Sequence, residues 1–189
     1  MIFGITGGTG CGKTTALEAL HSLGGVCLDC DAIYHDLLKT DKALLAAIEG
    51  RFPGVVKAGQ LDRKALGSRV FADPAALADL NTITHAAVKQ RVLELLPKDG
   101  TPAAIDAIGL FESGLDQLCG VTVGILAPKA DRLRRIMARD GIPEGYAQMR
   151  LDAQPEDGYF REKCDYILEN TGTEAEFRRK SLDFFLKFL

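Results

Sequence analysis

The first fifteen residues, Met1–Thr15, read MIFGITGGTGCGKTT and decide the fold of the chain. A short apolar run containing Phe3 and Ile5 ends in glycines, and the glycines lead into a Gly-Lys-Thr triplet. Residues 7–14 fit G-x-x-x-x-G-K-[ST], the spacing of the phosphate-binding P-loop. This order predicts a buried strand, a tight turn that cradles phosphate, and a helix that starts near Lys13.

Each part of this loop has a predicted contact with a nucleoside triphosphate and Mg²⁺. Successive backbone N–H groups face one anion, and side chains at the glycines would obstruct that approach. Lys13 reaches the β- and γ-phosphates, and the Thr14 hydroxyl is placed to ligate Mg²⁺. A dinucleotide-binding G-x-G-x-x-G pattern fails because Lys13 stands where its last glycine belongs. The residues predicted to contact the nucleotide are Gly8, Thr9, Gly10, Cys11, Gly12, Lys13, Thr14 and Thr15.

Composition sets the class of protein and of partner. The chain has 189 residues, of which 47% are hydrophobic, so residues 1–189 can form one domain of ordinary size. Its net charge of −3 argues against a nucleic-acid partner. The odd number of cysteines, five, favours a reducing compartment. No run of 18 apolar residues appears, and the N-terminal residues enter the loop motif without the charged region or cleavage site that a signal peptide would show. We expect a cytoplasmic protein with small-molecule substrates and no membrane partner, as a monomer or weak homo-oligomer.

Two acids follow the second predicted strand, Val26–Leu28. Asp29 and Asp31 stand where the carboxyl end of a parallel strand opens into a ligand crevice. They face the same side if the strand persists, whereas a helix that begins near Ile33 separates them. In the second case one of the acids is a candidate helix cap rather than a chemical group.

The third predicted strand, Pro102–Leu110, is an apolar run interrupted by Asp106. A buried acid needs a compensating interaction. In a P-loop fold, the strand that faces the phosphate loop supplies an acid that holds Mg²⁺ or its waters. Asp106 is therefore the second predicted metal-binding residue, together with Thr14.

Residues 41–96 show a helical pattern between the second and third strands. P-loop kinases of small molecules usually build their acceptor site in such an insertion, which is an argument by analogy of fold. Arg63 lies in this stretch, although a lone arginine is more often a solvated surface residue.

The fourth predicted strand, Val121–Ala127, leads into a helix that carries a basic stripe. Arg132, Arg135 and Arg139 stand at i, i+3 and i+7, so they share one helix face. Glycine and proline at 141 and 143 then break the chain, as a mobile flap requires. We predict a lid over about 128–160 that brings arginines onto the transferred phosphate, the alternative being a solvated face.

A fifth predicted strand, Asp165–Leu168, precedes a last helix that a Thr173-x-x-Glu176 capping box opens. Five strands interleaved with helices predict an α/β fold of three layers, with a five-stranded parallel sheet covered on both faces. Phenylalanines line one face of the last helix and should pack in the core; they are Phe177, Phe184, Phe185 and Phe188.

Nearly the whole chain resembles the dephospho-coenzyme A kinases. GGTGCGKT at 7–14 looks like the family's loop, and Leu28-Asp29-Cys30-Asp31 is similar to its D-A-D stretch. Leu61-Asp62-Arg63 is similar to its L-D-R segment, and Asp106 with Leu110-Phe111-Glu112 matches the ends of D-x-P-L-L-F-E. The lid pattern ends in R-x-x-x-Q, and the residues that fall on it are Arg135, Arg139, Arg150 and Gln154.

The chain departs from the family pattern at a few positions. Arg132 stands where glutamine is more usual, and Phe160 where lysine is common. His85 fits a histidine of the family, but Ala86 replaces the proline that normally follows it. Ile108-Gly109 replaces a proline and a leucine.

The resemblance implies transfer of the γ-phosphoryl of Mg·ATP to the 3′-hydroxyl of dephospho-coenzyme A. Asp31 then falls on the catalytic base, while Lys13 and Arg139 carry the charge of the transferred group. The donor set gains Arg135, Asn170 and Gly172, with the asparagine near adenine. The implied acceptor residues are Asp31, Arg63, His85, Asp106 and Leu110.

Two other functions remain open from the sequence. Another small-molecule P-loop kinase would take a nucleotide, a sugar or shikimate as acceptor. A nucleotide-switched binding protein of the GTPase kind is the alternative from a different class. It would require an N-K-x-D guanine signature, which the chain lacks, and the arginine lid would have no purpose in it.

Overall fold

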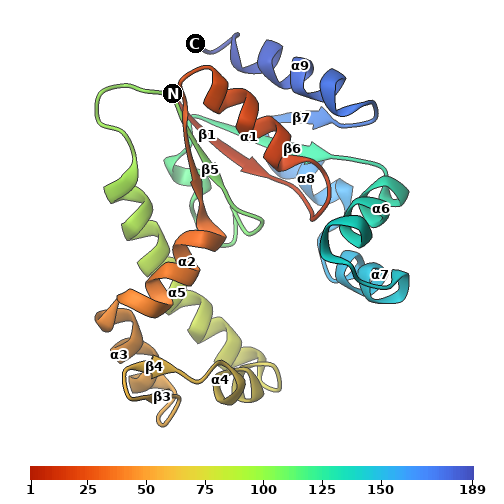
Figure 1. The fold of residues 1–189 in the computed structure, drawn as a ribbon. Coiled ribbons are helices and arrows are strands. Elements are labelled where there is room, and N and C mark those ends of the chain that lie inside the picture. Colours follow the sequence, from red (N-terminus) through yellow and green to blue (C-terminus); the bar gives the residue numbers. More distant parts are fainter. The chain divides into compact units, whose positions relative to one another are not determined.

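The strand that carries the phosphate loop lies at the centre of a parallel sheet. In the computed structural model, which describes residues 1–189, this strand is β1 (Ile2–Thr6), and the sheet has the order β2-β5-β1-β6-β7 (Figure 1). β1 pairs in parallel with β5 on one side and β6 on the other. Central strands are covered on both faces, which explains why their residues are continuously apolar. The other strands of the sheet are β2 (Val26–Asp29), β5 (Ala103–Asp106), β6 (Val121–Leu126) and β7 (Tyr166–Glu169).

The chain divides into two compact units. The core unit comprises Met1–Leu28, Pro97–Leu110 and Leu115–Leu189, and the helical unit comprises Asp29–Leu96 and Phe111–Gly114. Besides the sheet, the core unit contains α1 (Lys13–Ser22), a 3₁₀ turn (Asp116–Leu118), α6 (Lys129–Asp140), α7 (Glu144–Asp152), α8 (Asp157–Lys163) and α9 (Glu174–Phe185). The helical unit contains α2 (Cys30–Thr40), α3 (Lys42–Arg51), α4 (Arg63–Val70), α5 (Pro74–Leu95) and the hairpin β3 (Val56–Lys57) and β4 (Gln60–Leu61).

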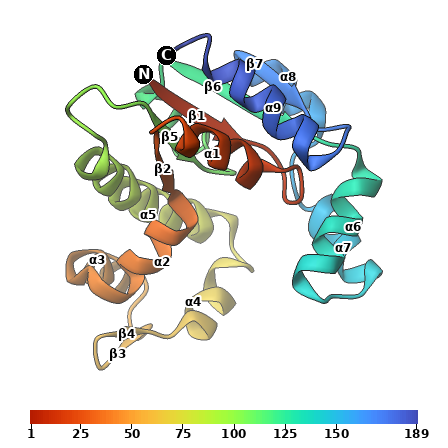
Figure 2. The same ribbon diagram turned by 45° about the horizontal axis from the view of Figure 1, so that its top comes forward.

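The core unit has the three layers that the sequence predicts. α1 and α9 pack against each other over one face of the sheet (Figure 2). They bury a cluster that includes Phe3 and Ile5 of β1 and the predicted aromatic stripe of α9. α8 covers the opposite face, where a Cβ atom at Gly124 of β6 would stand 3.3 Å from Phe160 Cβ. Because side chains alternate along a strand, Val123 and Ile125 face α1 and α9 instead.

All four helices of the helical unit begin with an aspartate cap. Their N-caps are Asp29, Asp41, Asp62 and Asp73, and each carboxylate accepts hydrogen bonds from backbone N–H groups of the first turn. Pro74 at the start of α5 confirms the predicted helix start. α5 then packs against α2, α3 and α4, so it is the helix on which this unit is assembled. Residue types that favour capping therefore set where each helix starts.

Two predicted boundaries were wrong. The helix after the second strand begins at Cys30 and not near Ile33, because Asp29 ends β2 and caps α2 at once. The third strand stops at Asp106, since the next residues turn: Thr6 Oγ1 donates to the Ile108 carbonyl at 3.0 Å, and the Leu110 carbonyl accepts from Leu115 N at 3.1 Å.

The single domain of residues 1–189, with an insertion over about 41–96 and a lid over about 128–160, stays a prediction. The helical unit itself starts at Asp29, earlier than that insertion. None of the helices combines the length and the apolar composition needed to cross a lipid bilayer.

We predict that Phe185→Ala lowers the free energy of unfolding by about 3–5 kcal/mol, the range for truncating a buried phenylalanine. Phe185 is fully buried, and its ring centroid lies 5.0 Å from that of Phe3. Leu186→Ala is the matched control, because this neighbour is 57% exposed and should change stability by less than about 0.5 kcal/mol. Equal losses in urea unfolding of the two variants would contradict the assignment of this cluster as core.

Candidate active site

The phosphate loop turns on glycines in the left-handed region. Gly10 has φ 79° and Gly12 has φ 103°, and Gly12 is the residue that precedes the first turn of α1. Lys13 begins α1, as predicted, and its Nζ donates to the Gly7 carbonyl at 2.9 Å. The lysine therefore lies back over its own loop, next to the N–H groups of the helix start that favour an anion.

Neighbouring side chains also limit the size of the loop residues. A Cβ atom at Gly8 would overlap the Arg132 guanidinium, and one at Gly12 would overlap the Asn170 amide. At Gly10, a Cβ atom would stand 2.8 Å from the Arg132 carbonyl oxygen. The loop is thus packed against α6 and against Asn170. This packing is a second physical reason why these positions require glycine, in addition to the close approach of a phosphate.

Asn170 joins the end of β7 to the phosphate loop. It is 4% exposed, and its Nδ2 donates to the Cys11 carbonyl at 2.9 Å, while its Oδ1 accepts no hydrogen bond. The predicted asparagine is therefore in direct contact with the loop. Gly172 lies in the exposed turn before α9, where the predicted capping box of Thr173 and Glu176 forms.

The predicted stripe of arginines on α6 divides into two groups. Arg132 Nε donates to the Thr9 carbonyl at 3.0 Å, and Arg135 NH1 donates to the Gly10 carbonyl at 3.1 Å. Arg139 instead forms an ion pair with its neighbour Asp140, at 2.6 Å from Nε to Oδ1. Two of the three arginines thus contact the loop, and the predicted catalytic one does not in this conformation.

Gln154 is bonded to the same loop residue as Arg132. Its Oε1 accepts from Thr9 N at 2.8 Å and from Arg132 NH2 at 3.0 Å, and its Nε2 donates to Thr9 Oγ1 at 2.6 Å. The predicted site residues did not include Arg132 or Gln154. The available signals were the position of Arg132 on the stripe and of Gln154 at the end of R-x-x-x-Q.

α6 and α7 have a small core of their own. Ile136, Ala147 and Leu151 are buried there, and Leu133, Met137 and Ile142 pack against them. Within the segment predicted as a lid, α6 and α7 therefore form a helical hairpin. The backbone of α6 and the Ile136 side chain lie close to Gly10, whereas the side-chain hydrogen bonds to the phosphate loop come from polar residues. Such contacts can exchange without disturbing the packing of the hairpin.

Cys11 is a buried filler of the loop. Burial raises the pKa of its thiol, and the nearby positive charges of Lys13 and Arg132 oppose that rise. Because the pKa lies above its ordinary value, the thiol is neutral at physiological pH. Lys13 and Arg132 therefore both lie near enough for their positive charges to act on the Cys11 thiol inside the loop.

The two residues predicted to bind Mg²⁺ are Thr14 and Asp106, and both carry oxygen donors. Thr14, in the first turn of α1, has an exposed side chain, and Asp106 is half-buried at the end of β5, paired in register with Ile5 of β1. Hydroxyl and carboxylate oxygens suit a hard cation. No group of three or more acidic, histidine or cysteine side chains is placed to hold a metal ion.

Leu110, a predicted acceptor residue, is completely buried. A Cβ atom at Gly4 would stand 2.8 Å from its Cδ2, so the leucine fills the space that this glycine leaves in β1. Its side chain is therefore part of the core.

The two acids after β2 have different tasks. The Asp29 carboxylate accepts from Ala32 N at 3.0 Å and caps α2. Asp31 lies exposed in the first turn of α2, and its carboxylate makes neither a hydrogen bond nor an ion pair; only its carbonyl is used, by His35 Nδ1. Of the two, only Asp31 has a carboxylate available for chemistry.

Arg63 is the first residue of α4 and directly follows Asp62, the N-cap of that helix. Asp62 accepts from Ala65 N at 2.9 Å and pairs with Lys57 Nζ at 2.9 Å, so the helix start is held from both sides. Arg63 itself is exposed and forms no ion pair, although its charge opposes the burial that raises the pKa of Tyr34 on α2. It is free to bind an anion.

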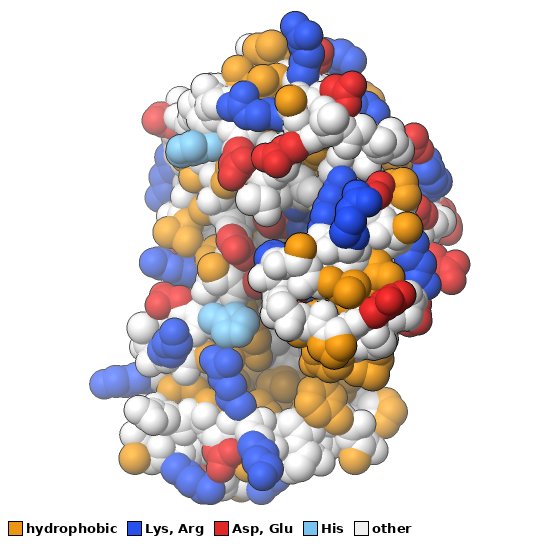
Figure 3. All heavy atoms as spheres, turned by 45° about the vertical axis from the view of Figure 1, so that its right-hand side comes forward, with side chains coloured by type: hydrophobic (Ala, Val, Ile, Leu, Met, Phe, Trp, Pro, Cys, Tyr) orange, Lys and Arg blue, Asp and Glu red, His pale blue; other side chains and the backbone are white.

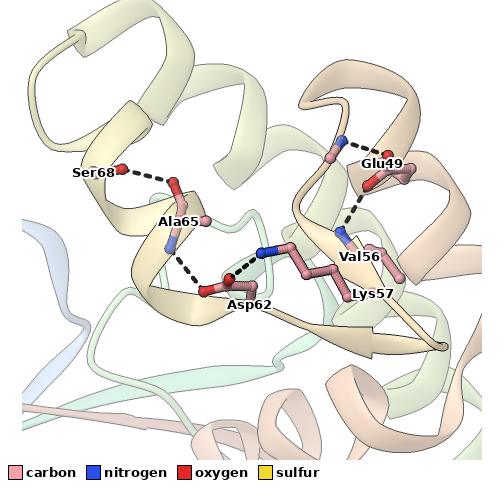
Figure 4. Close-up of polar contacts among 7 residues, drawn as sticks. Glu49, Val56, Lys57, Asp62, Ala65 and Ser68 are labelled. Carbon is pink, nitrogen blue, oxygen red and sulfur yellow. Dashed lines mark hydrogen bonds and ion pairs between the residues drawn. The ribbon is translucent and has the colours of Figure 1, made fainter.

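The hairpin that leads to Arg63 is itself anchored by one acid. Both oxygens of Glu49 on α3 accept from backbone N–H groups, at 2.5 Å from Gly54 and at 2.7 Å from Val56 (Figure 4). These bonds tie the hairpin to α3, and the hairpin in turn sets where α4 begins.

His85 is half-buried on α5. Burial lowers its pKa, and the nearby negative charge of Glu112 partly opposes the shift. Both residues belong to the helical unit. The imidazole is therefore neutral at pH 7 and suited to hydrogen bonding rather than to holding an anion by charge.

We predict that Asp140→Asn removes a pH-dependent part of the stability. Hydrogen bonds from Arg139 and Arg150 lower the pKa of Asp140 from 3.8 to about 2. A lowered pKa stabilises the fold fully above the ordinary value, and this contribution is lost as the pH falls toward 2. The difference in Tm between wild type and variant should be constant from pH 7 to about pH 5 and shrink below about pH 4. A difference that persists unchanged at pH 2.5 would contradict the cause we assign.

Known proteins resemble this chain over almost its full length. The model of the dephospho-CoA kinase family matches residues 1–176. A dephospho-CoA kinase of Thermobifida fusca is 36% identical over 177 residues, covering 92% of this chain and 88% of the relative.

Solved structures agree with these matches. The crystal structure of TT1252 from Thermus thermophilus has a TM-score of 0.84 at 33% identity and covers 100% of this chain and 97% of its own. The dephospho-CoA kinase of Campylobacter jejuni has a TM-score of 0.71 at 31% identity, with coverage of 99% and 96%. The chain with this phosphate loop, parallel sheet and helical unit belongs to the dephospho-CoA kinase family.

Proposed function

We propose that this chain transfers the γ-phosphoryl group of ATP to the 3′-hydroxyl of dephospho-coenzyme A, producing coenzyme A and ADP in the last step of coenzyme A biosynthesis. The observation that carries the proposal is the family match over residues 1–176, which spans the phosphate loop, the helical unit and the lid hairpin together. The use of ATP follows from membership in a kinase family.

The core unit supplies the donor contacts. Lys13 exchanges the Gly7 carbonyl for the β- and γ-phosphates, and the N–H groups from Gly8 to Thr15 cradle the triphosphate. Arg135 lies on the loop already, whereas Arg139 has to leave Asp140 before it reaches the transferred group. Asn170 and Gly172 complete the donor set near the adenine. Arginine charge stabilises the negative charge that develops during transfer.

We propose Thr14 and Asp106 as the residues that hold Mg²⁺, with phosphate oxygens as further ligands. When bound, the ion neutralises phosphate charge and orients the β- and γ-phosphates. The helix start at Lys13 places the Thr14 hydroxyl beside the loop, and the register of β1 with β5 places Asp106 level with Ile5.

The helical unit supplies the acceptor contacts. Asp31 accepts the proton of the 3′-hydroxyl as the oxygen attacks the γ-phosphorus, and the bond between that phosphorus and the bridging oxygen of ADP breaks. Its available carboxylate, in contrast to that of Asp29, supports this role. Arg63 binds an anionic group of the acceptor, and the neutral His85 supplies a hydrogen bond.

The distribution of charge supports small-molecule substrates. On the face in Figure 3, lysine and arginine side chains stand in separate groups among acidic and uncharged ones. A nucleic-acid partner is recognised by a concentrated basic surface, which this face does not present. We further propose that the protein is cytoplasmic, which the five free thiols support because such thiols persist in a reducing compartment. As to its assembly, we propose a monomer or weak homo-oligomer.

Replacing Asp31 by asparagine should lower kcat by roughly 10²–10⁴-fold, the usual contribution of a general base, while the KM for ATP stays within about twofold. Asp36→Asn is the matched control, since Asp36 is an exposed aspartate of the same helix whose side chain makes no contact. Steady-state kinetics with both substrates checks this prediction. An Asp31→Asn enzyme with full kcat would rule out the assigned role.

Dephospho-coenzyme A should be the preferred acceptor in a panel that also contains a nucleoside monophosphate, a sugar and shikimate. The readout is phosphorylated product measured by mass spectrometry, with ADP formation as the second measure. Success with another acceptor and failure with dephospho-coenzyme A would overturn the function but not the fold. Tight nucleotide binding without turnover on any acceptor would instead favour the nucleotide-switched protein.

A further inference from the structure

Arg132 is a buried cation without a buried counter-ion. It is 7% exposed, and it is absent from every ion pair of the structure. A cavity of about 510 Å³ beside it also has carboxylates in its wall, but Asp152 is paired with Lys129, and Glu156 and Asp157 form no ion pair with the arginine. A buried charge is costly unless a partner compensates it.

The guanidinium is fully oriented, although it is not neutralised. Nε donates to the Thr9 carbonyl at 3.0 Å, and NH2 donates to Gln154 Oε1 at 3.0 Å. Gln154 then holds the N–H and the hydroxyl of the same threonine, at 2.8 Å and 2.6 Å. Thr9 is thus held by hydrogen bonds at its carbonyl, its N–H and its side chain, and both partners, Arg132 and Gln154, come from more than a hundred residues later in the chain.

These hydrogen bonds act on a part of the loop that lies outside both the sheet and α1. Thr9 lies between the end of β1 and the first turn of α1, and Gly10 next to it adopts a left-handed φ of 79°. A flexible loop would lose entropy when it closes around phosphate, and ordering it beforehand removes that cost from nucleotide binding. Arg132 also lies close enough to the loop interior for its positive charge to oppose, in part, the burial that raises the pKa of the Cys11 thiol.

We propose that Arg132 is a positioning residue for the nucleotide: together with Gln154 it holds Thr9 so that the phosphate loop is ordered before ATP arrives, and its buried charge is balanced by the bound phosphates. This inference deepens the proposed function at the donor side and concerns a residue outside the predicted site set. It predicts that Arg132 matters for ATP and not for the acceptor.

The test compares Arg132→Gln and Arg132→Lys with Arg134→Gln. Arg134 is on the same helix, 75% exposed and paired only with Asp131, so its replacement controls for loss of one positive charge on α6. Binding of Mg·ATP and of Mg·ADP is measured by calorimetry without acceptor, kcat and both KM values by steady-state assay, and Tm by thermal unfolding.

Arg132→Gln should weaken ATP and ADP binding by about 10- to 100-fold, the effect of one lost charge-assisted interaction, and leave the acceptor KM within about twofold. Lysine keeps the charge but not the two-pronged geometry, so Arg132→Lys should lie between glutamine and wild type. ATP binding by Arg132→Gln within about twofold of wild type would overturn the proposal. Equal increases in both KM values would also overturn it, because the effect would then not be specific to the nucleotide.

A second measurement keeps the test decisive if Arg132→Gln proves unstable. Gln154→Ala, Arg132→Lys and the double variant form a cycle, in which residues that grip one threonine should show effects on ATP binding that are not additive. Strict additivity would contradict the shared grip. Nucleotide binding is measured without acceptor, so failure of the acceptor panel would reject the proposed function and leave this inference standing. Unchanged ATP binding by Arg132→Gln would reject this inference and leave the proposed function standing.

Discussion

The phosphate loop has no room for larger side chains, and the rest of the core unit is arranged around that constraint. Arg132 crosses the loop at Gly8, the backbone of α6 approaches Gly10, and Asn170 approaches Gly12. The strand and helix on either side place the loop, but these three neighbours give it its shape. Their contacts come from positions more than a hundred residues away, which ties the fold of the carboxyl-terminal half to the binding of the donor.

The three arginines of the α6 stripe differ in whether a carboxylate pairs with them. Near the loop, Arg132 and Arg135 donate to carbonyl oxygens and have no carboxylate partner, so their charge stays available to a phosphate. At the other end of α6, Arg139 is paired with Asp140. An anion that draws Arg139 away must compete with an aspartate whose pKa is held near 2. The stripe therefore contains two arginines that already contact the loop, Arg132 and Arg135, and a third, Arg139, that must leave Asp140 before it can bind a phosphate.

The helices of the helical unit could be predicted from the sequence, but the roles of its individual acidic residues could not. Aspartates before apolar helical runs indicate caps, and Asp41 and Asp73 are used in that way. The sequence left open whether Asp29 or Asp31 caps the next helix, because both stand at suitable distances from it. The structure places the helix start at Cys30, so Asp29 is the cap and Asp31 keeps a free carboxylate. Leu110, a residue within a matching motif, has its side chain in the core, and its predicted contact with the acceptor stays a prediction.

The sequence alone determined the phosphate loop, the five parallel strands, the aromatic side of α9 and the position of the acids at the strand ends. These features depend on periodicity, glycine conformation and capping, which are local properties of neighbouring residues. Only the tertiary structure decided that Arg132 and Gln154 grip Thr9, that Arg139 is held by Asp140, and that Leu110 is buried. The grip on Thr9 and the burial of Leu110 against Gly4 depend on side chains that meet across more than a hundred residues, which no local pattern reveals. Arg139 and Asp140 are neighbours in the sequence, but whether they pair depends on how the folded chain orients their side chains.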